Sequence, residues 1–144
     1  MVEEIRHGDD LLAIILRAGF SDPGVNFVTP NTFPQQLAYM RHPVGKQIQP
    51  HVHNPVKREL NTTFEVLVIK QGKLRVDFYT REQHYLFSKA LGAGDTILLT
   101  DAGGHGFEVL DDLEMLEIKQ GPYVEGQDKV RFAAPTDFQP RWLD

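Results

Sequence analysis

The feature that most constrains this fold is a succession of short β-rich runs after Pro30, with no helical segment among them. Gly, Pro, Asn and Asp bound these runs, which is typical of strands joined by turns. Eight strands at this spacing predict an all-β sandwich or barrel. The runs cover residues 36–41, 46–53, 63–70, 73–80, 84–91, 95–100, 105–110 and 113–119.

Two dipeptides predict tight hairpins between neighbouring runs. Gln71-Gly72 separates the runs 63–70 and 73–80, and Asp111-Asp112 separates the last two runs. In 73–80 apolar and polar residues alternate, which predicts a half-buried strand with one face in water. The residues of that predicted wet face are Lys73, Arg75, Asp77 and Tyr79.

The chain ends differ from this middle part. Residues 8–18 start with Asp9 or Asp10 as an N-cap and stop at Gly19, so a short helix is preferred there over an apolar edge segment. The length of 144 residues predicts one domain, 1–144. We divide it into an N-terminal arm 1–35, a barrel core of about 36–119 and a tail 120–144 that wraps over the domain or a neighbouring subunit.

Composition excludes several classes of function. The formal charge of −5 and the scattered basic residues argue against a nucleic-acid partner. Cysteine is absent, so any metal must be held by nitrogen and oxygen ligands. The acidic N-terminus lacks the charge of a signal peptide, and no apolar run is long enough to span a membrane, so we expect a cytoplasmic protein without a membrane partner.

The sequence His51-Val-His53 is the strongest chemical signal. On a strand, residues two apart share a face, so both imidazoles would point the same way. Two imidazoles form half of a transition-metal site, which a distant His and a carboxylate would complete.

Two short motifs resemble those of the cupin superfamily. The first runs from Gly45 through five residues to His51-Val-His53, and then from Glu65 through six residues to Gly72. The second runs from Gly94-Asp95 to Gly103-Gly104-His105. The resemblance covers about 36–119 and implies a double-stranded β-helix, the jelly-roll barrel of cupins.

The chain departs from the family pattern at two places. Eleven residues separate His53 from Glu65 where the family usually has only a few, and Thr100 and Ala102 replace the usual Pro and Gly. The long insert leaves Glu59 as a rival carboxylate. Glu65 is favoured because it opens a strand at the family distance from Gly72.

The resemblance implies a ligand set and a pocket. The strand carrying the His pair would lie beside the strand of His105, so that an ion of Fe, Mn, Ni, Co or Zn is held inside the barrel. Gln47 and Gln49 would orient substrate or simply fill a polar lumen. Lys57 and Arg58 would bind a carboxylate or phosphate, or belong to a solvated loop. Phe107 would line the pocket, and Gln49 or Tyr123 would assist proton transfer. The implied metal ligands are His51, His53, Glu65 and His105.

The chain also looks like small cupins associated with cell-surface sugar biosynthesis, which share its Lys57-Arg58 and Lys119-Gln-Gly-Pro-Tyr123 phrases. This implies a metal-dependent isomerase or epimerase acting on a small oxygenated or anionic metabolite, such as a sugar derivative. The alternatives are a non-haem iron dioxygenase, a non-catalytic small-molecule or sugar-binding module, and a metal-free epimerase with His51 or His53 as base. A homodimer is the expected assembly.

Overall fold

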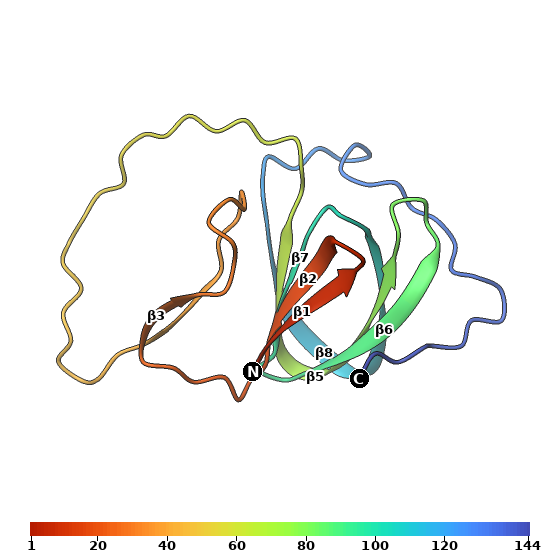
Figure 1. The fold of residues 1–144 in the computed structure, drawn as a ribbon, viewed down its shortest axis with the longest axis horizontal. Coiled ribbons are helices and arrows are strands. Elements are labelled where there is room, and N and C mark those ends of the chain that lie inside the picture. Colours follow the sequence, from red (N-terminus) through yellow and green to blue (C-terminus); the bar gives the residue numbers. More distant parts are fainter.

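The computed structural model describes all residues 1–144 and consists of strands and loops without a helix, so none of its segments is a helix able to cross a membrane. The predicted all-β class is confirmed, and the main sheet curls into a half-barrel (Figure 1). The strands are β1 (Val2–His7), β2 (Asp10–Leu16), β3 (Gly24–Phe27), β4 (Ala38–Arg41), β5 (Glu65–Tyr79), β6 (Tyr85–Gly92), β7 (Thr96–Leu99) and β8 (Gly104–Lys119).

One six-stranded antiparallel sheet forms the body, in the order β1-β2-β7-β5-β6, with β8 also paired to β5. The long strand β5 organises it: its first residues pair with β7, its last residues pair with β6, and β8 follows it along almost its whole length. Strands β3 and β4 form a separate two-stranded sheet.

The predicted helix in residues 8–18 is wrong, because this stretch is the β1–β2 hairpin. Strand β2 lies between β1 and β7, and the four consecutive residues Leu12 to Ile15 are all buried. A continuous apolar run with adjacent Ile residues suits a strand covered on both faces, and pairing on both edges outweighs the weak capping signal.

The two predicted hairpins are also wrong. Gln71-Gly72 lies inside β5 and Asp111-Asp112 lies inside β8, where the β5–β8 pairing shifts register. Gly72 has a φ of 81°, which suits a bulge as well as a turn. The chain therefore continues through both positions, and the two irregularities face each other across the ladder.

This bulge changes which residues of β5 face the main core. Before it, the odd-numbered Leu67 and Ile69 belong to the largest apolar cluster; after it, the even-numbered Leu74, Val76 and Phe78 belong to the same cluster. All five are at most 1% exposed. A regular strand alternates faces with period two, so the bulge is what lets both halves of β5 bury apolar side chains in one core.

Replacing Gly72 by Ala is expected to lower the free energy of unfolding by about 2–5 kcal/mol, as left-handed strain adds to overpacking. A Cβ at Gly72 would lie 2.0 Å from the carbonyl oxygen of Asp112. Gly8→Ala is the matched control, because Gly8 has a φ of 59° and no atom within 4 Å of an added Cβ. Urea denaturation measures the free energy of unfolding of both variants. Equal losses of stability would contradict the steric argument.

The run 46–53 forms no strand, contrary to the prediction, and of 36–41 only Ala38–Arg41 is a strand, paired with β3. Residues 42–64 leave the body as the wide loop seen in Figure 1. A strand requires a neighbouring edge to satisfy its backbone, and no strand of the same chain pairs with this stretch.

The predicted wet face of 73–80 is buried over much of its length: Arg75 is 9% exposed, Asp77 6% and Tyr79 4%. The C-terminal tail helps to cover it. Phe132 packs edge-on against Tyr79, and the Arg75 guanidinium lies over the ring of Phe138. The tail therefore wraps over its own domain, and Trp142 extends the β6 edge through a parallel bridge to Ser88.

A cluster of charges ties the first strand to the far side of the sheet. Glu3 accepts from Arg17 at 2.6 Å and lies 3.0 Å from Lys89, while Arg17 also donates to Asp95 at 2.8 Å. The hydrogen bond from Arg17 lowers the pKa of Glu3 below 4.5, whereas burial acts to raise it.

The cluster predicts a pH-dependent stability. Since the folded pKa of Glu3 is lowered, its stabilisation is complete above pH 4.5 and is lost as the pH falls through the folded pKa. The stability advantage of the wild type over Glu3→Gln should therefore shrink below pH 4.5 in urea denaturation. Glu4→Gln is the control, because Glu4 forms only an exposed pair with Arg6. An advantage that does not change with pH would exclude this role of Glu3.

Candidate functional site

Glu65 and His105 form the central pair of the candidate site. Glu65 opens β5 and His105 is the second residue of β8, and the Nε2 of His105 lies 3.2 Å from the Glu65 Oε2. The Glu65 side chain is 10% exposed and that of His105 is 26% exposed. A carboxylate and an imidazole thus meet at a partly shielded position that solvent still reaches.

The two residues are not cross-strand neighbours. Glu65 pairs with Leu99 and Lys119, whereas His105 pairs with Phe78 at the other end of β5. Their contact therefore depends on the curl of the sheet, which brings the two ends of the β5–β8 ladder toward each other.

The surroundings keep Glu65 ionised. Its hydrogen bond with His105 is the largest influence and lowers the pKa of Glu65 below 4.5, while burial acts in the opposite direction. The ammonium of Lys119, 3.9 Å away, adds a smaller attraction. Lys119 also donates to Asp128 at 2.9 Å, and this hydrogen bond raises the pKa of Lys119.

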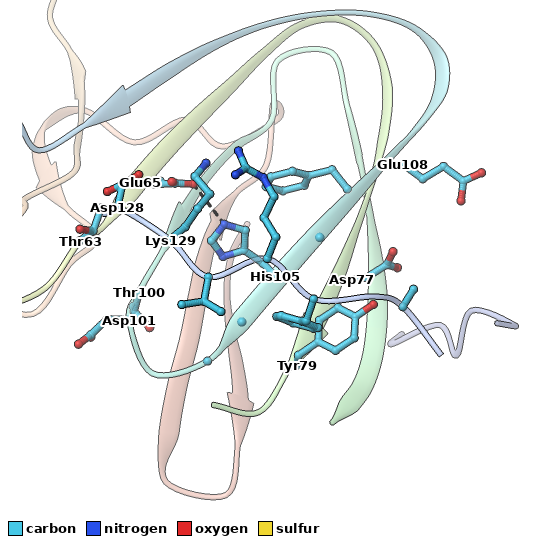
Figure 2. A pocket seen from close by; sticks show the side chains of 18 of the residues that line it. Thr63, Glu65, Asp77, Tyr79, Thr100, Asp101, His105, Glu108, Asp128 and Lys129 are labelled. Carbon is cyan, nitrogen blue, oxygen red and sulfur yellow. Dashed lines mark ion pairs between the residues drawn. The ribbon is translucent and has the colours of Figure 1, made fainter. Parts of the chain in front are cut away.

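This pair lies in a pocket of about 670 Å³, shown in Figure 2. The volume is within the range of small-molecule sites. Its lining is mostly polar or charged, unlike the apolar lining of most ligand sites. The pocket is lined by Thr63, Glu65, Arg75, Asp77, Tyr79, Thr100, Asp101, Gly103, Gly104, His105, Gly106, Phe107, Glu108, Asp128, Lys129, Val130, Arg131, Phe132 and Ala134.

The cations of the pocket fall into two groups. Arg75 is held by two hydrogen bonds to Asp77, at 2.8 and 3.0 Å, and by an ion pair with Glu108. Lys129 and Arg131 are exposed on the tail, and neither forms an ion pair or a side-chain hydrogen bond. Arg75 is thus a wall residue, while Lys129 and Arg131 are free to meet an anion.

Of the other residues predicted for the site, Phe107 lines the pocket with Glu65 and His105. Tyr123 is 65% exposed and has the Lys119 ammonium 5.4 Å from its ring centroid. The remaining predicted residues belong to an exposed stretch that we call the 43–61 segment and do not line the pocket; they are Gln47, Gln49, His51, His53, Lys57 and Arg58.

Within the 43–61 segment, His51 and His53 lie beside each other, with ring centroids 5.2 Å apart. The rival carboxylate Glu59 is also there, 3.4 Å from Lys57. The four predicted ligands therefore lie in two separate pairs, which we name the body half-site (Glu65 and His105) and the segment half-site (His51 and His53).

The residues do not fit a complete metal site in this arrangement. No three His, Asp or Glu side chains are placed to share an ion. Transition-metal sites in proteins generally use three or more protein ligands. Each half-site supplies two, so the four predicted ligands would serve one ion only if the half-sites met.

Sequence reasoning did not select Arg75, Asp77, Lys129 and Arg131 for the site. The alternation of polar and apolar residues predicted that Arg75 and Asp77 face solvent, because this pattern does not show that the tail covers them. Lys129 and Arg131 alternate with Val130 and Phe132, and this amphipathic stretch of the tail was the available signal.

Comparisons with known proteins give no further assignment: no family model, curated protein or solved structure matches this chain.

Proposed function

We propose that this protein is a cupin-type enzyme that binds a small, oxygenated, anionic metabolite such as a sugar derivative, and moves a proton on it in an isomerisation or epimerisation. The observation that carries the proposal is the 3.2 Å contact of His105 with an ionised Glu65 in a pocket of substrate size.

The contact with Glu65 suits His105 to act as a general base. A proton on Nε2 is donated to the Glu65 carboxylate, which fixes the ring and leaves Nδ1 without a protein partner. A neutral imidazole held in this way accepts a proton from a carbon next to a carbonyl, the step shared by isomerases and epimerases. Glu65 orients the ring and stabilises the imidazolium that forms.

The tail supplies the means of holding an anion. Lys129 and Arg131 line the pocket without an internal partner. A guanidinium binds two oxygens of a carboxylate or phosphate at once, and an ammonium adds attraction without a fixed geometry. This arrangement favours a substrate with a phosphate or carboxylate group at one end and a reacting carbon near His105.

The half-sites favour a second candidate, a metal-dependent form of the same chemistry. Glu65 and His105 would then be ligands together with His51 and His53, and the ion would be Fe, Mn, Ni, Co or Zn. An ion held by these residues would supply Lewis-acid chemistry to a bound substrate. In this form His105 holds the ion, and the base lies elsewhere, with Gln49 and Tyr123 as candidates.

Hydrogen–deuterium exchange tests the proposal. The protein is incubated in D₂O with sugar phosphates and nucleotide-activated sugars, and NMR follows the loss of proton signals next to carbonyl carbons. Exchange that persists with a chelator supports the His105 base, and exchange that a chelator abolishes supports the metal-dependent form.

Three results would contradict the isomerase proposal. Consumption of O₂ coupled to turnover would indicate a dioxygenase. Binding of a panel member without exchange would indicate a non-catalytic module. Neither binding nor exchange with any member would remove the case for this substrate class.

A further inference from the structure

The C-terminal tail crosses the domain with few buried side chains. Figure 1 shows it as a loop that runs around the outside of the curled sheet after β8. Its backbone hydrogen bonds to the rest of the domain are confined to Arg141 and Leu143, which both bond to Ser88. The tail is therefore attached at separate points rather than packed along its length. Beyond Gln120, its half-buried residues are Asp128, Phe132, Phe138 and Pro140.

The end of the tail docks on strand β6. The ring of Phe138 packs edge-on against that of Tyr85, with centroids 4.8 Å apart. The amide of Ser88 donates to the Arg141 carbonyl at 2.7 Å, and the amide of Leu143 donates to the Ser88 carbonyl at 2.9 Å. An aromatic contact and two backbone hydrogen bonds thus hold the end of the chain on the free edge of β6. We call this attachment the terminal anchor (residues 138–143).

The tail has a second attachment at the pocket. Asp128 accepts a hydrogen bond from the Lys119 ammonium at 2.9 Å. The ring of Phe132 packs edge-on against Tyr79, with centroids 5.0 Å apart. Residues 129–131, between these two contacts, are exposed and line the pocket. The two contacts therefore hold this short stretch as one wall of the pocket.

This wall lies beside the reactive pair. Lys119, which holds Asp128, lies 3.9 Å from Glu65, and Figure 2 shows Asp128 and Lys129 near Glu65. The tail supplies six of the 19 residues that line the pocket, among them Lys129 and Arg131, the cations without an ion pair. The body of the domain supplies Glu65 and His105. A substrate that reaches both groups would therefore join the tail to the body.

The manner of attachment makes release of the tail a local event. A segment with few buried apolar contacts and few backbone hydrogen bonds opens at a much lower free energy than the whole domain. The sheet keeps its own core when the tail leaves, because the main apolar cluster contains no tail residue. Release would expose the pocket and separate Lys129 and Arg131 from it.

We propose that the tail is a strap that opens to admit substrate and that the phosphate or carboxylate group of the substrate closes by binding Lys129 and Arg131. The docked tail fixes these two cations in the pocket, whereas a released tail must first be ordered before it can bind an anion there. Anion binding and docking of the tail therefore stabilise each other, by the same factor in both directions. This inference rests on the proposed function in giving the substrate an anionic group.

The proposal makes Phe138 a positioning residue. Its side chain does not line the pocket, but it belongs to the terminal anchor. It would act on the substrate only through the tail, by setting the fraction of molecules in which Lys129 and Arg131 stand at the pocket.

Amide hydrogen exchange of the full-length protein tests the strap, with inorganic phosphate as the probe and NaCl of equal ionic strength as the reference. Exchange at the Leu143 amide, followed by NMR, should slow about tenfold at a phosphate concentration about ten times its Kd, since the tail must lose the anion before it opens. The amide of Val28 bonds to Leu37 in the N-terminal arm and should not respond.

A pair of matched variants shows which cations transmit the effect. Lys129→Ala/Arg131→Ala should abolish the slowing at Leu143. Lys57→Ala/Arg58→Ala removes the same charge from an exposed part of the 43–61 segment and should leave the slowing intact. Equal slowing in both variants would overturn the assignment of Lys129 and Arg131.

Calorimetry of phosphate binding separates the remaining outcomes. Binding without any change at Leu143 would show that the tail is a fixed wall and would overturn the strap. Absence of binding would also overturn the strap, whereas the His105 base of the proposed function is decided independently by deuterium exchange into sugar derivatives.

The variant Phe138→Ala tests the terminal anchor. Exchange at Leu143 should become about tenfold faster, and it gives the docked fraction of the tail. The Kd of phosphate should rise over that of the wild type in inverse proportion to this fraction. Val124→Ala, at an exposed tail position outside both attachments, should change neither quantity. Unchanged exchange would overturn the role of Phe138, and a released tail with an unchanged Kd would overturn the coupling.

Discussion

Replacing His105 by Ala is expected to lower the rate of deuterium exchange into a bound sugar derivative by roughly 10²–10⁴-fold, the usual contribution of a positioned base. The imidazole is the group in the pocket that is held by an ionised carboxylate and has a ring nitrogen free to accept a proton. Exchange is measured by NMR in D₂O on the sugar derivative that the wild type processes fastest.

Two controls make this result specific. His84→Ala removes an exposed imidazole outside the pocket and should leave the rate unchanged. Glu65→Gln keeps the shape of the side chain but not its charge, so it should reduce the rate less than loss of the base. A His105→Ala protein that folds and exchanges as fast as the wild type would contradict the assignment.

Replacing Asp77 by Ala is expected to lower the free energy of unfolding by about 3–5 kcal/mol, as for other broken buried ion pairs. Asp77 accepts two hydrogen bonds from Arg75 and one from the Ser88 hydroxyl. Ser88 is fully buried, and its backbone bonds to Arg141 and Leu143 of the tail. The substitution leaves a buried guanidinium without its main partner and loosens the attachment of the tail.

Urea denaturation measures this loss, and hydrogen exchange at the amide of Leu143 reports the attachment of the tail. Asp111→Ala is the control, because Asp111 is exposed on β8 and bonds only to the neighbouring Asp112 amide. Its effect should stay within about 0.5 kcal/mol. A loss below about 1 kcal/mol for Asp77→Ala would indicate that the pair contributes little.

The sequence predicted the all-β class and most strand positions, because period-two alternation is a local property. It did not distinguish a turn from a bulge at Gly72, since a glycine with positive φ suits both. The choice depends on β8, whose Asp112 lies opposite but forty residues later in the chain. The strand at residues 10–16 could not be predicted for a similar reason, because it depends on pairing with β7, which is distant in the sequence.

For the site, the order of the two motifs predicted Glu65 and His105 as candidate residues, and these two side chains lie in contact in the structure. The His51–His53 pair was predicted on a strand beside β8, but a strand forms only where an edge is available. Strand β8 pairs only with β5, and residues 42–64 form a loop, so these histidines lie on no strand. The burial of Arg75 and Asp77 is not predictable from local sequence, because the C-terminal tail, distant in the chain, covers them.

The bulge in β5 sets a condition on how this chain can change in length. Ile69 and Leu74 are an odd number of residues apart, and the bulge lets both face one core. One extra residue between them would make this separation even, so a regular strand without a bulge would keep Leu74, Val76 and Phe78 in the core. In relatives of this protein, such an insertion should therefore accompany loss of the positive-φ glycine at position 72, whereas the long loop of residues 42–64 can vary in length independently of the sheet.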